Sequence, residues 1–191
     1  MKYSLYNLLQ AFPPNTYNRE SWNYYLDPST TNTGIVLEST TTKKLLIFSL
    51  DFSKIKIDKD IDKSNHFNAK LKQIYPIFQQ LIQEFPPSSI YMEGIFIQPK
   101  FFTSSSVLLK FHGFLSTIFI NYPIYYHPPK QIKKRITGNG NASKEEVKDK
   151  LEEKYQIQFK NNDQSDAFAI WEYEWEEKNP GEKPEKIIEL M

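Results

Sequence analysis

The alternation of short apolar runs with longer amphipathic segments is the feature that most constrains how this chain can fold. Three strand-like runs come first, and helix-like and strand-like segments then alternate toward the C-terminus. Short runs rich in aromatic and β-branched residues indicate strands, and apolar residues repeated every three or four positions indicate helices. The expected strands are Trp22–Asp27, Ile35–Glu38, Leu45–Phe52, Ser89–Glu93 and Ile124–His127, and the expected helices are Asn65–Phe85, Thr103–Ile120, one that begins after Ser143, and Asn162–Glu177.

Up to the third of these helices the order is β-β-β-α-β-α-β-α, which predicts an α/β domain with a five-stranded mixed sheet flanked by helices and is the order of a ribonuclease-H-like fold. The length of 191 residues suits one domain with a sizeable core. A Pro13-Pro14 pair precedes the first strand, and Pro180-Gly181 follows the last helix. We therefore predict an N-terminal extension at 1–20, a folded domain at 21–177 and a polar C-terminal tail at 178–191.

The absence of cysteine from the sequence excludes several kinds of site. Without thiols there are no disulfides, no thiolate zinc sites and no cysteine nucleophile. No apolar run reaches the roughly 18 to 20 residues that a membrane span needs, and the first residues lack the pattern of a secretory signal. We therefore expect a cytoplasmic protein without a membrane partner.

The charges are unevenly distributed, although the formal net charge is only +1. The segment 130–144 contains no acidic residue, and an uninterrupted basic segment can bind a polyanion. Charge alone would fit a solvated basic face equally well. Gly138 and Gly140 favour DNA binding, because glycines let a backbone approach a phosphate closely. The basic residues of this segment are Lys130, Lys133, Lys134, Arg135 and Lys144.

Four acidic residues lie at positions where a carboxylate is unexpected or shares a surface with another. Asp27 ends an aromatic run, Glu93 lies inside an apolar run, and Asp163 and Asp166 face the same side of an expected helix. A buried carboxylate is costly unless it is paired or binds a metal. Taken singly, Asp27 could start a turn before a proline and Asp163 could interact with the helix dipole. Together, the four predict one cation site with hard oxygen ligands for Mg²⁺ or Mn²⁺.

The spacing around the first two acids resembles the motifs of a known family, the RuvC-type Holliday junction resolvases. The first family motif is Asp-Pro-Gly, four residues and Gly, and here Asp27, Pro28 and Gly34 keep three of those positions. The second is a Glu at the end of a strand with an aromatic residue three positions later, which Glu93 and Phe96 match. The chain departs from the first motif at Ser29 and Thr31, which affects expected DNA contacts and not the chemistry.

Two further motifs strengthen this resemblance, which covers roughly residues 22–173 in the right order. Residues 129–147 look like the family run that contains a basic residue, Gly-x-Gly-x-Ala and then Lys and Val. Residues 163–169 match Asp, two residues and Asp-Ala-x-Ala. One such motif is weak, whereas four in order are a strong indication.

The resemblance implies a Mg²⁺-dependent endonuclease that resolves four-way DNA junctions by paired symmetric nicks, as a homodimer. Mn²⁺ could substitute, and two ions per active site would be bound by Asp27, Glu93, Asp163 and Asp166 as catalytic ligands. Phe96 would contact DNA, and one of Phe96, Phe101 and Phe102 would act as a wedge at the junction centre, with core packing as the alternative role for at least one of the three. The second helix would form the dimer interface. The expected phosphate contacts are Lys133, Lys134, Arg135, Lys144, Gly138 and Gly140. His112, within that second helix, is interpreted as a core or interface residue.

Two alternatives stay open at this point. One is a broader branched-DNA or flap nuclease of the ribonuclease-H-like class, and the other is a junction-binding protein without turnover. The acidic quartet argues against the second, because a pure binder gains nothing from carboxylates beside phosphate. Nothing in the sequence supports or excludes a branch-migration motor as a partner, and the preferred cleavage sequence is not predicted.

Overall fold

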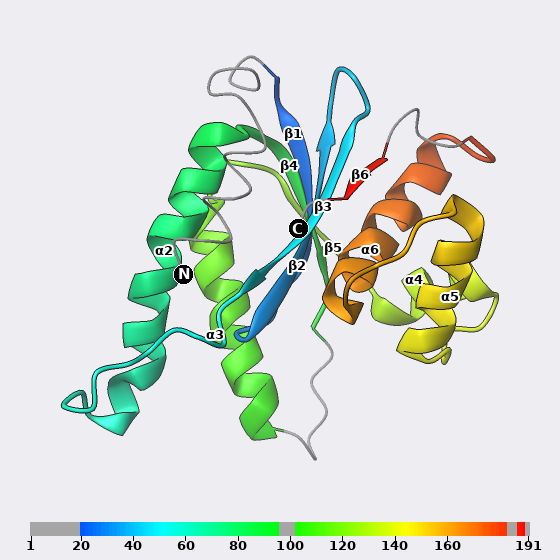
Figure 1. Ribbon diagram of the computed structural model, residues 1–191. Helices are drawn as coiled ribbons and strands as arrows, with labels where there is room; N and C mark the ends of the chain where they lie inside the picture. The colour runs from blue at the N-terminus through cyan, green and yellow to red at the C-terminus, as the bar shows by residue number, and fades with distance from the viewer. Residues whose placement is uncertain (1–19, 96–101, 183–186, 190–191) are drawn as a thin grey trace.

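A mixed β-sheet with helices on both faces forms the fold of the computed structural model, which describes residues 20–95, 102–182 and 187–189 (Figure 1). The strand order is β5-β4-β1-β2-β3-β6. Phe96, Phe101 and the predicted N-terminal extension up to residue 19 lie outside the described residues.

The strand β1 (Trp22–Asp27) lies inside the sheet, between β2 and β4. It pairs antiparallel with β2 (Asn32–Ser39) and parallel with β4 (Pro87–Glu93). β3 (Leu45–Asp51) continues the antiparallel meander, and β5 (Ile124–His127) adds a parallel edge beside β4. Because β1 has a neighbour on each side, a side chain at its C-terminal end can be approached from two strands.

The helices divide between the two faces of the sheet (Figure 1). α2 (His66–Glu84) and α3 (Phe102–Ile118) cover one face, and α4 (Pro129–Thr137), α5 (Lys144–Tyr155) and α6 (Asn162–Lys178) lie on the other. Alternate residues of each strand supply the two cores, as the two-residue period of a strand requires. Leu26 packs on the α2/α3 side, whereas Tyr25 packs on the α6 side.

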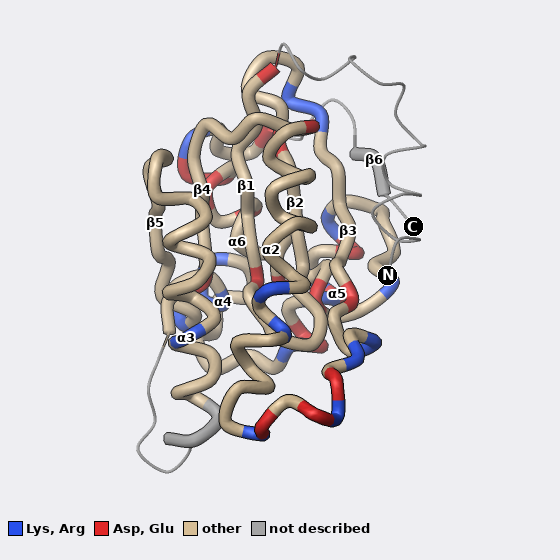
Figure 2. Tube along the Cα trace, turned by 90° about the vertical axis from the view of Figure 1, so that its left-hand side faces the viewer, with Lys and Arg blue, Asp and Glu red and all other residues tan. Residues whose placement is uncertain are grey.

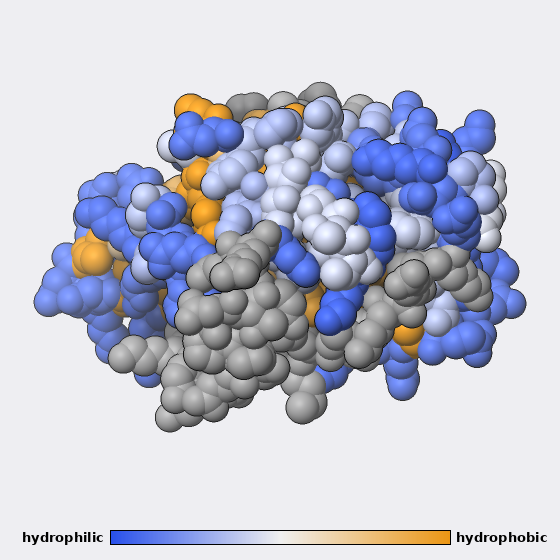
Figure 3. Space-filling model, turned by 90° about the horizontal axis from the view of Figure 1, so that it is seen from above, coloured by the Kyte–Doolittle hydropathy of each residue, from blue (hydrophilic) through white to orange (hydrophobic). Residues whose placement is uncertain are grey.

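All five expected strands and all four expected helices are present, and the α/β mixed sheet is confirmed. Three elements were not predicted from the sequence, and the first is a single 3₁₀ turn at Lys63–Asn65, just before α2. Residues 187–189, placed in a polar tail by their composition, form a short strand β6 parallel to β3. α4 occupies the basic segment and has only two large apolar residues, Ile132 and Ile136, of which only Ile132 is buried, so few residues indicate a helix there. The end of the molecule viewed in Figure 3 is largely hydrophilic over its described residues.

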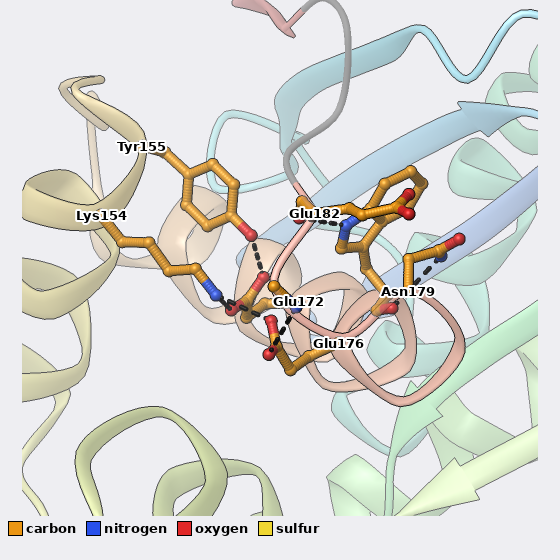
Figure 4. A network of polar contacts seen from close by, with 8 residues as sticks. Lys154, Tyr155, Glu172, Glu176, Asn179 and Glu182 are labelled. Atoms are coloured by element: carbon orange, nitrogen blue, oxygen red, sulfur yellow. Dashed lines mark hydrogen bonds and ion pairs between the residues drawn. The ribbon is translucent and has the colours of Figure 1, made fainter.

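A buried carboxylate fastens α5 to α6. Glu172 is 4% exposed and accepts hydrogen bonds from the Lys154 ammonium, at 2.7 Å, and from the Tyr155 hydroxyl (Figure 4). Lys154 also donates to Glu176 at 2.9 Å, and the Trp175 indole donates to the carbonyl of Glu182 at 2.8 Å. This network fixes the C-terminal half of α6, the helix that carries Asp163 and Asp166 at its other end.

Replacing Glu172 by Ala should destabilise the protein by about 2–4 kcal/mol, because the buried Tyr155 hydroxyl would lose its acceptor and Lys154 one of its counter-charges. Urea unfolding followed by circular dichroism measures this loss. The control is Glu177→Ala, which removes an exposed ion pair with Arg135 at 3.6 Å and should cost less than about 1 kcal/mol. Equal losses in the two variants would contradict a structural role for Glu172.

Candidate active site

Two of the four predicted acids come from adjacent parallel strands. Asp27 is the last residue of β1 and Glu93 the last of β4. In the parallel register Leu26 pairs with Met92, so the next residues, Asp27 and Glu93, end at the same edge of the sheet. The carboxyl ends of parallel strands are where α/β proteins commonly place their sites. The structure therefore brings these two predicted residues together.

The N-terminus of α6 lies directly against β2 at this edge. Gly34 pairs with Asp27 across the β1/β2 ladder, and a Cβ built on Gly34 would lie 1.8 Å from the backbone oxygen of Asp163. Only a residue without a side chain allows this approach. The helix start is held by Asn161, whose side chain caps the Gln164 amide at 2.9 Å and donates to the Ser49 hydroxyl at 3.0 Å.

Electrostatic effects on Asp27, Glu93 and Asp166 indicate that the four acids lie near one another. Burial raises the pKa of Asp27 well above its ordinary value, and the charges of Asp166, Glu93 and Asp163 raise it further, against an opposing effect of Lys144. Burial likewise raises the pKa of Glu93, with Asp166 adding to it. The pKa of Asp166 is raised by burial in spite of Lys144. Repulsion among buried like charges is relieved by a bound cation or by protonation.

Two of the predicted basic residues supply part of that positive charge. Lys144, the first residue of α5, donates a hydrogen bond to the Asp166 carboxylate. Lys133 donates to the carbonyl of Ala142 at 2.7 Å, and its charge lowers the pKa of Glu93 and Asp166. Both ammonium groups therefore lie near the carboxylates.

The other predicted DNA contacts have different surroundings. Lys134 is exposed, whereas Arg135 lies 5.0 Å over the Tyr173 ring and pairs with Glu177. Gly138 ends α4 in the left-handed conformation, with φ of 80°. A Cβ on Gly140 would lie 3.0 Å from the carbonyl of Lys130. The two glycines thus shape the turn between α4 and α5, whether or not they also approach DNA.

Sequence reasoning missed one polar residue at the site, Asn32. This first residue of β2 donates from its amide to the Asp163 carboxylate, and its own Oδ1 is buried without a partner among the described residues. Asparagine in a turn-like segment has no feature that indicates a partner 131 residues away. Only the close approach of α6 to β2 creates this contact.

The residues fit a hard divalent cation in chemistry, although not in their present arrangement. Among the described residues no group of three acidic or histidine side chains is placed to hold an ion. Lys144 holds Asp166 and Asn32 holds Asp163, so two of the carboxylates are turned to other partners. The donors are all carboxylate oxygens, which Mg²⁺ and Mn²⁺ prefer. A bound cation would relieve the repulsion that raises the pKa of Asp27.

A profile of the family described as crossover junction endodeoxyribonuclease RuvC matches residues 25–171. This chain belongs to the RuvC family. The match begins within β1 and ends within α6, so it includes Asp27, Glu93, Asp163 and Asp166. The resemblance seen in the sequence motifs is thereby confirmed.

Curated relatives of this RuvC-family chain carry the name crossover junction endodeoxyribonuclease RuvC. The protein of Christiangramia forsetii is 33% identical over 75% of this chain and 73% of its own length. That of Orientia tsutsugamushi strain Boryong is 30% identical over 75% of this chain and 88% of its own length. The match to the Pseudothermotoga lettingae protein is shorter and spans 54% of that protein, at 33% identity.

Solved structures confirm the ribonuclease-H-like fold at low sequence identity. Thermus thermophilus RuvC has a TM-score of 0.57 at 18% identity, with 85% of this chain and 99% of that chain covered. The same protein in complex with a Holliday junction substrate has a TM-score of 0.54, with 78% and 90% covered. The yeast mitochondrial Holliday junction resolvase has a TM-score of 0.55 at 16% identity, with 83% and 79% covered. No helix among the described residues is long and apolar enough to cross a membrane.

Proposed function

We propose that this RuvC-family protein is a metal-dependent endonuclease that resolves four-way DNA junctions by paired, symmetric nicks. The observation that carries this proposal is the joining of four carboxylates from β1, β4 and α6 at one edge of the sheet, with Lys133 and Lys144 beside them. Family membership and the junction-bound relative support the choice of substrate. We also propose a cytoplasmic location, as expected for an enzyme that acts on DNA.

The proposed chemistry is hydrolysis of a phosphodiester with Mg²⁺, for which Mn²⁺ could substitute. Two such ions, when bound, neutralise charge on the phosphate and activate water. Asp27 and Glu93 would hold them from the strand ends, and Asp163 and Asp166 from α6. Lys144 would exchange its contact with Asp166 for a phosphate oxygen, and Lys133 would add a second positive charge. The four carboxylates thus serve as ligands, whereas the two lysines orient the DNA backbone.

A homodimer is proposed because paired nicks at a two-fold junction require two matched active sites. The face formed by α3 and β5 supports this assembly. α3 carries a single charged residue, Lys110, and the same side of the molecule shows few charges over α3 and β5 (Figure 2). Val107, Leu109 and Tyr126 are exposed there. Phe111 and Leu115 of the same helix are buried in the core of the monomer, so they are not available to a dimer interface.

Cleavage of a synthetic four-way junction, with and without Mg²⁺, tests this function in wild type and in Asp166→Asn. We expect symmetric nicks that need the metal and that fall by at least about 10³-fold in the variant, because the amide is a poorer ligand than the carboxylate. Junction binding should persist in the variant, measured by fluorescence anisotropy. Binding by wild type without nicking would favour the non-catalytic protein. Equal cleavage of forks and flaps would favour the broader nuclease.

A further inference from the structure

A pocket of about 230 Å³ adjoins the predicted catalytic carboxylates on the α3 side of the sheet. Asp27 and Glu93 form one border, and His112 and Ser105 of α3 contribute the polar groups on the helix side. The remaining lining is mostly apolar and comes from Pro28, Ile95, Leu108 and Pro129. Asp163 and Asp166 do not line this pocket. It therefore lies beside Asp27 and Glu93 and does not include the two acids of α6.

His112 is the unusual residue in this pocket. Its side chain is 6% exposed, yet its Nδ1 is buried with no hydrogen-bond partner in the part of the chain that the structure describes. The ring stacks on the Tyr126 ring, with centroids 6.3 Å apart and 26° between the planes. The hydroxyl of Tyr126 is hydrogen-bonded to the hydroxyl of Ser116 at 2.8 Å. A buried polar atom without a partner costs free energy. Such an atom calls for an explanation, and a water, an ion or a ligand bound in the pocket that His112 lines would supply its partner.

The lining indicates what kind of ligand would enter. Burial lowers the pKa of His112 to about 4, so the imidazole is neutral at neutral pH and offers one donor and one acceptor. A phosphate group in this pocket, in addition to the scissile phosphate, would be repelled by the carboxylates of Asp27 and Glu93. No Lys or Arg lines the pocket to offset that repulsion. Apolar walls with a few neutral polar groups suit a nucleobase, whose flat faces are apolar and whose edge makes hydrogen bonds.

We propose that this pocket receives a nucleobase next to the scissile phosphate and that His112 reads its edge by a hydrogen bond, making His112 a determinant of cleavage sequence. This inference rests on the proposed function, because it concerns the same strand cut at the same site. It identifies a residue that discriminates among junction sequences, whereas the carboxylates act on a phosphate that every sequence shares.

The test uses one junction in four versions, each with a different base at the nucleotide flanking the cut, and a fifth version with an abasic nucleotide there. Wild type should cut the best base about tenfold faster than the worst or the abasic version, which is the effect of about one hydrogen bond. His112→Phe keeps the ring against Tyr126 and removes both nitrogens. It should cut all five versions within about twofold of one another, at the slow rate of wild type on the abasic junction.

The control is His66→Phe, the same change at a histidine at the start of α2, whose ring nitrogen contacts the carbonyl of Ile61 at 2.9 Å. It should retain the wild-type preference. The inference is overturned if wild type cuts the abasic junction as fast as the best base, a result that does not depend on folding of the variant. It is also overturned if His112→Phe slows every version equally. If wild type nicks no junction at all, the proposed function fails and this inference fails with it.

Discussion

Replacing Asp27 by Asn should abolish junction cleavage and, at the same time, stabilise the protein in the absence of divalent metal. The loss of cleavage follows from the position of Asp27, whose pKa is raised by the charges of all three other acids. Removing the central carboxylate removes a ligand that the amide cannot replace, and we expect a fall of at least about 10³-fold. Binding of the junction should remain, because the basic residues are unchanged.

The gain in stability follows from the direction of the pKa shift. Burial, Asp166, Glu93 and Asp163 raise the folded-state pKa of Asp27 above its unfolded value. The ionised carboxylate therefore opposes folding at neutral pH, and this penalty disappears as pH falls below the unfolded value of about 3.9. Asn removes the charge at every pH. A gain of about 1 kcal/mol would raise the Tm by about 2–4 °C for a chain of this size.

Thermal unfolding between pH 4 and pH 8, with EDTA or with Mg²⁺, measures both effects. The difference in Tm between Asp27→Asn and wild type should shrink as pH falls toward 4. Mg²⁺ should raise the Tm of wild type more than that of the variant. The matched control is Asp51→Asn at the end of β3. Hydrogen bonds from Ser53 lower the pKa of Asp51, so its charge favours folding at neutral pH and its loss should not stabilise the protein. A lower Tm for Asp27→Asn in EDTA would refute the electrostatic argument.

The sequence predicts the strand ends of the site well because local and global signals agree there. Trp22–Asp27 and Ile124–His127 form strands with the expected bounds, and α5 begins after Ser143 as expected, with Ser143 and Glu146 forming a capping box. In each case the residues that decide the structure lie within a few positions of one another. The placement of Asp27 and Glu93 at one sheet edge then follows from two parallel strands, once the order of elements is known.

The remaining parts of the site depend on contacts between distant segments. Arg135 looks like a free DNA contact in sequence, and only the fold places Glu177 and Tyr173 beside it. His112 is interpreted from its sequence as a core or interface residue, and its burial agrees with that reading. Its place beside Asp27 becomes visible only when α3 is packed against β1 and β4. Patterns of hydrophobicity define which face a residue occupies, and they do not define its partner on the other element.

Replacing Gly34 by Ala should disrupt the site from a position that has no chemistry of its own. A Cβ at residue 34 would meet the backbone oxygen of Asp163 at 1.8 Å and its carbonyl carbon at 2.5 Å, so no side-chain rotation can relieve the overlap. The start of α6 must move away from β2, against the cap and the Ser49 contact made by Asn161. Overlap of this kind costs typically 1–3 kcal/mol or more.

That movement should also lower cleavage, since a misplacement of about 1 Å can cost about 10²-fold in rate. Asp163 and Asp166 would shift together relative to Asp27 and Glu93, while all four carboxylates stay in the chain. The expected result for Gly34→Ala is therefore a lower Tm in EDTA, a cleavage rate reduced by about 10²-fold, and a weaker rise of Tm with Mg²⁺. Asp27→Asn loses cleavage with a higher Tm, so the two variants separate ligand loss from ligand misplacement.

The control for stability is Gly113→Ala in α3, where a Cβ would meet no atom within 4 Å. Alanine within a helix is favoured over glycine by about 1 kcal/mol, so this variant should unfold at an equal or higher temperature. If Gly34→Ala matches wild type in Tm and in cleavage, α6 does not approach β2 as closely as the structure has it. The joint placement of Asp163 and Asp27 in one metal site would then lose its structural basis.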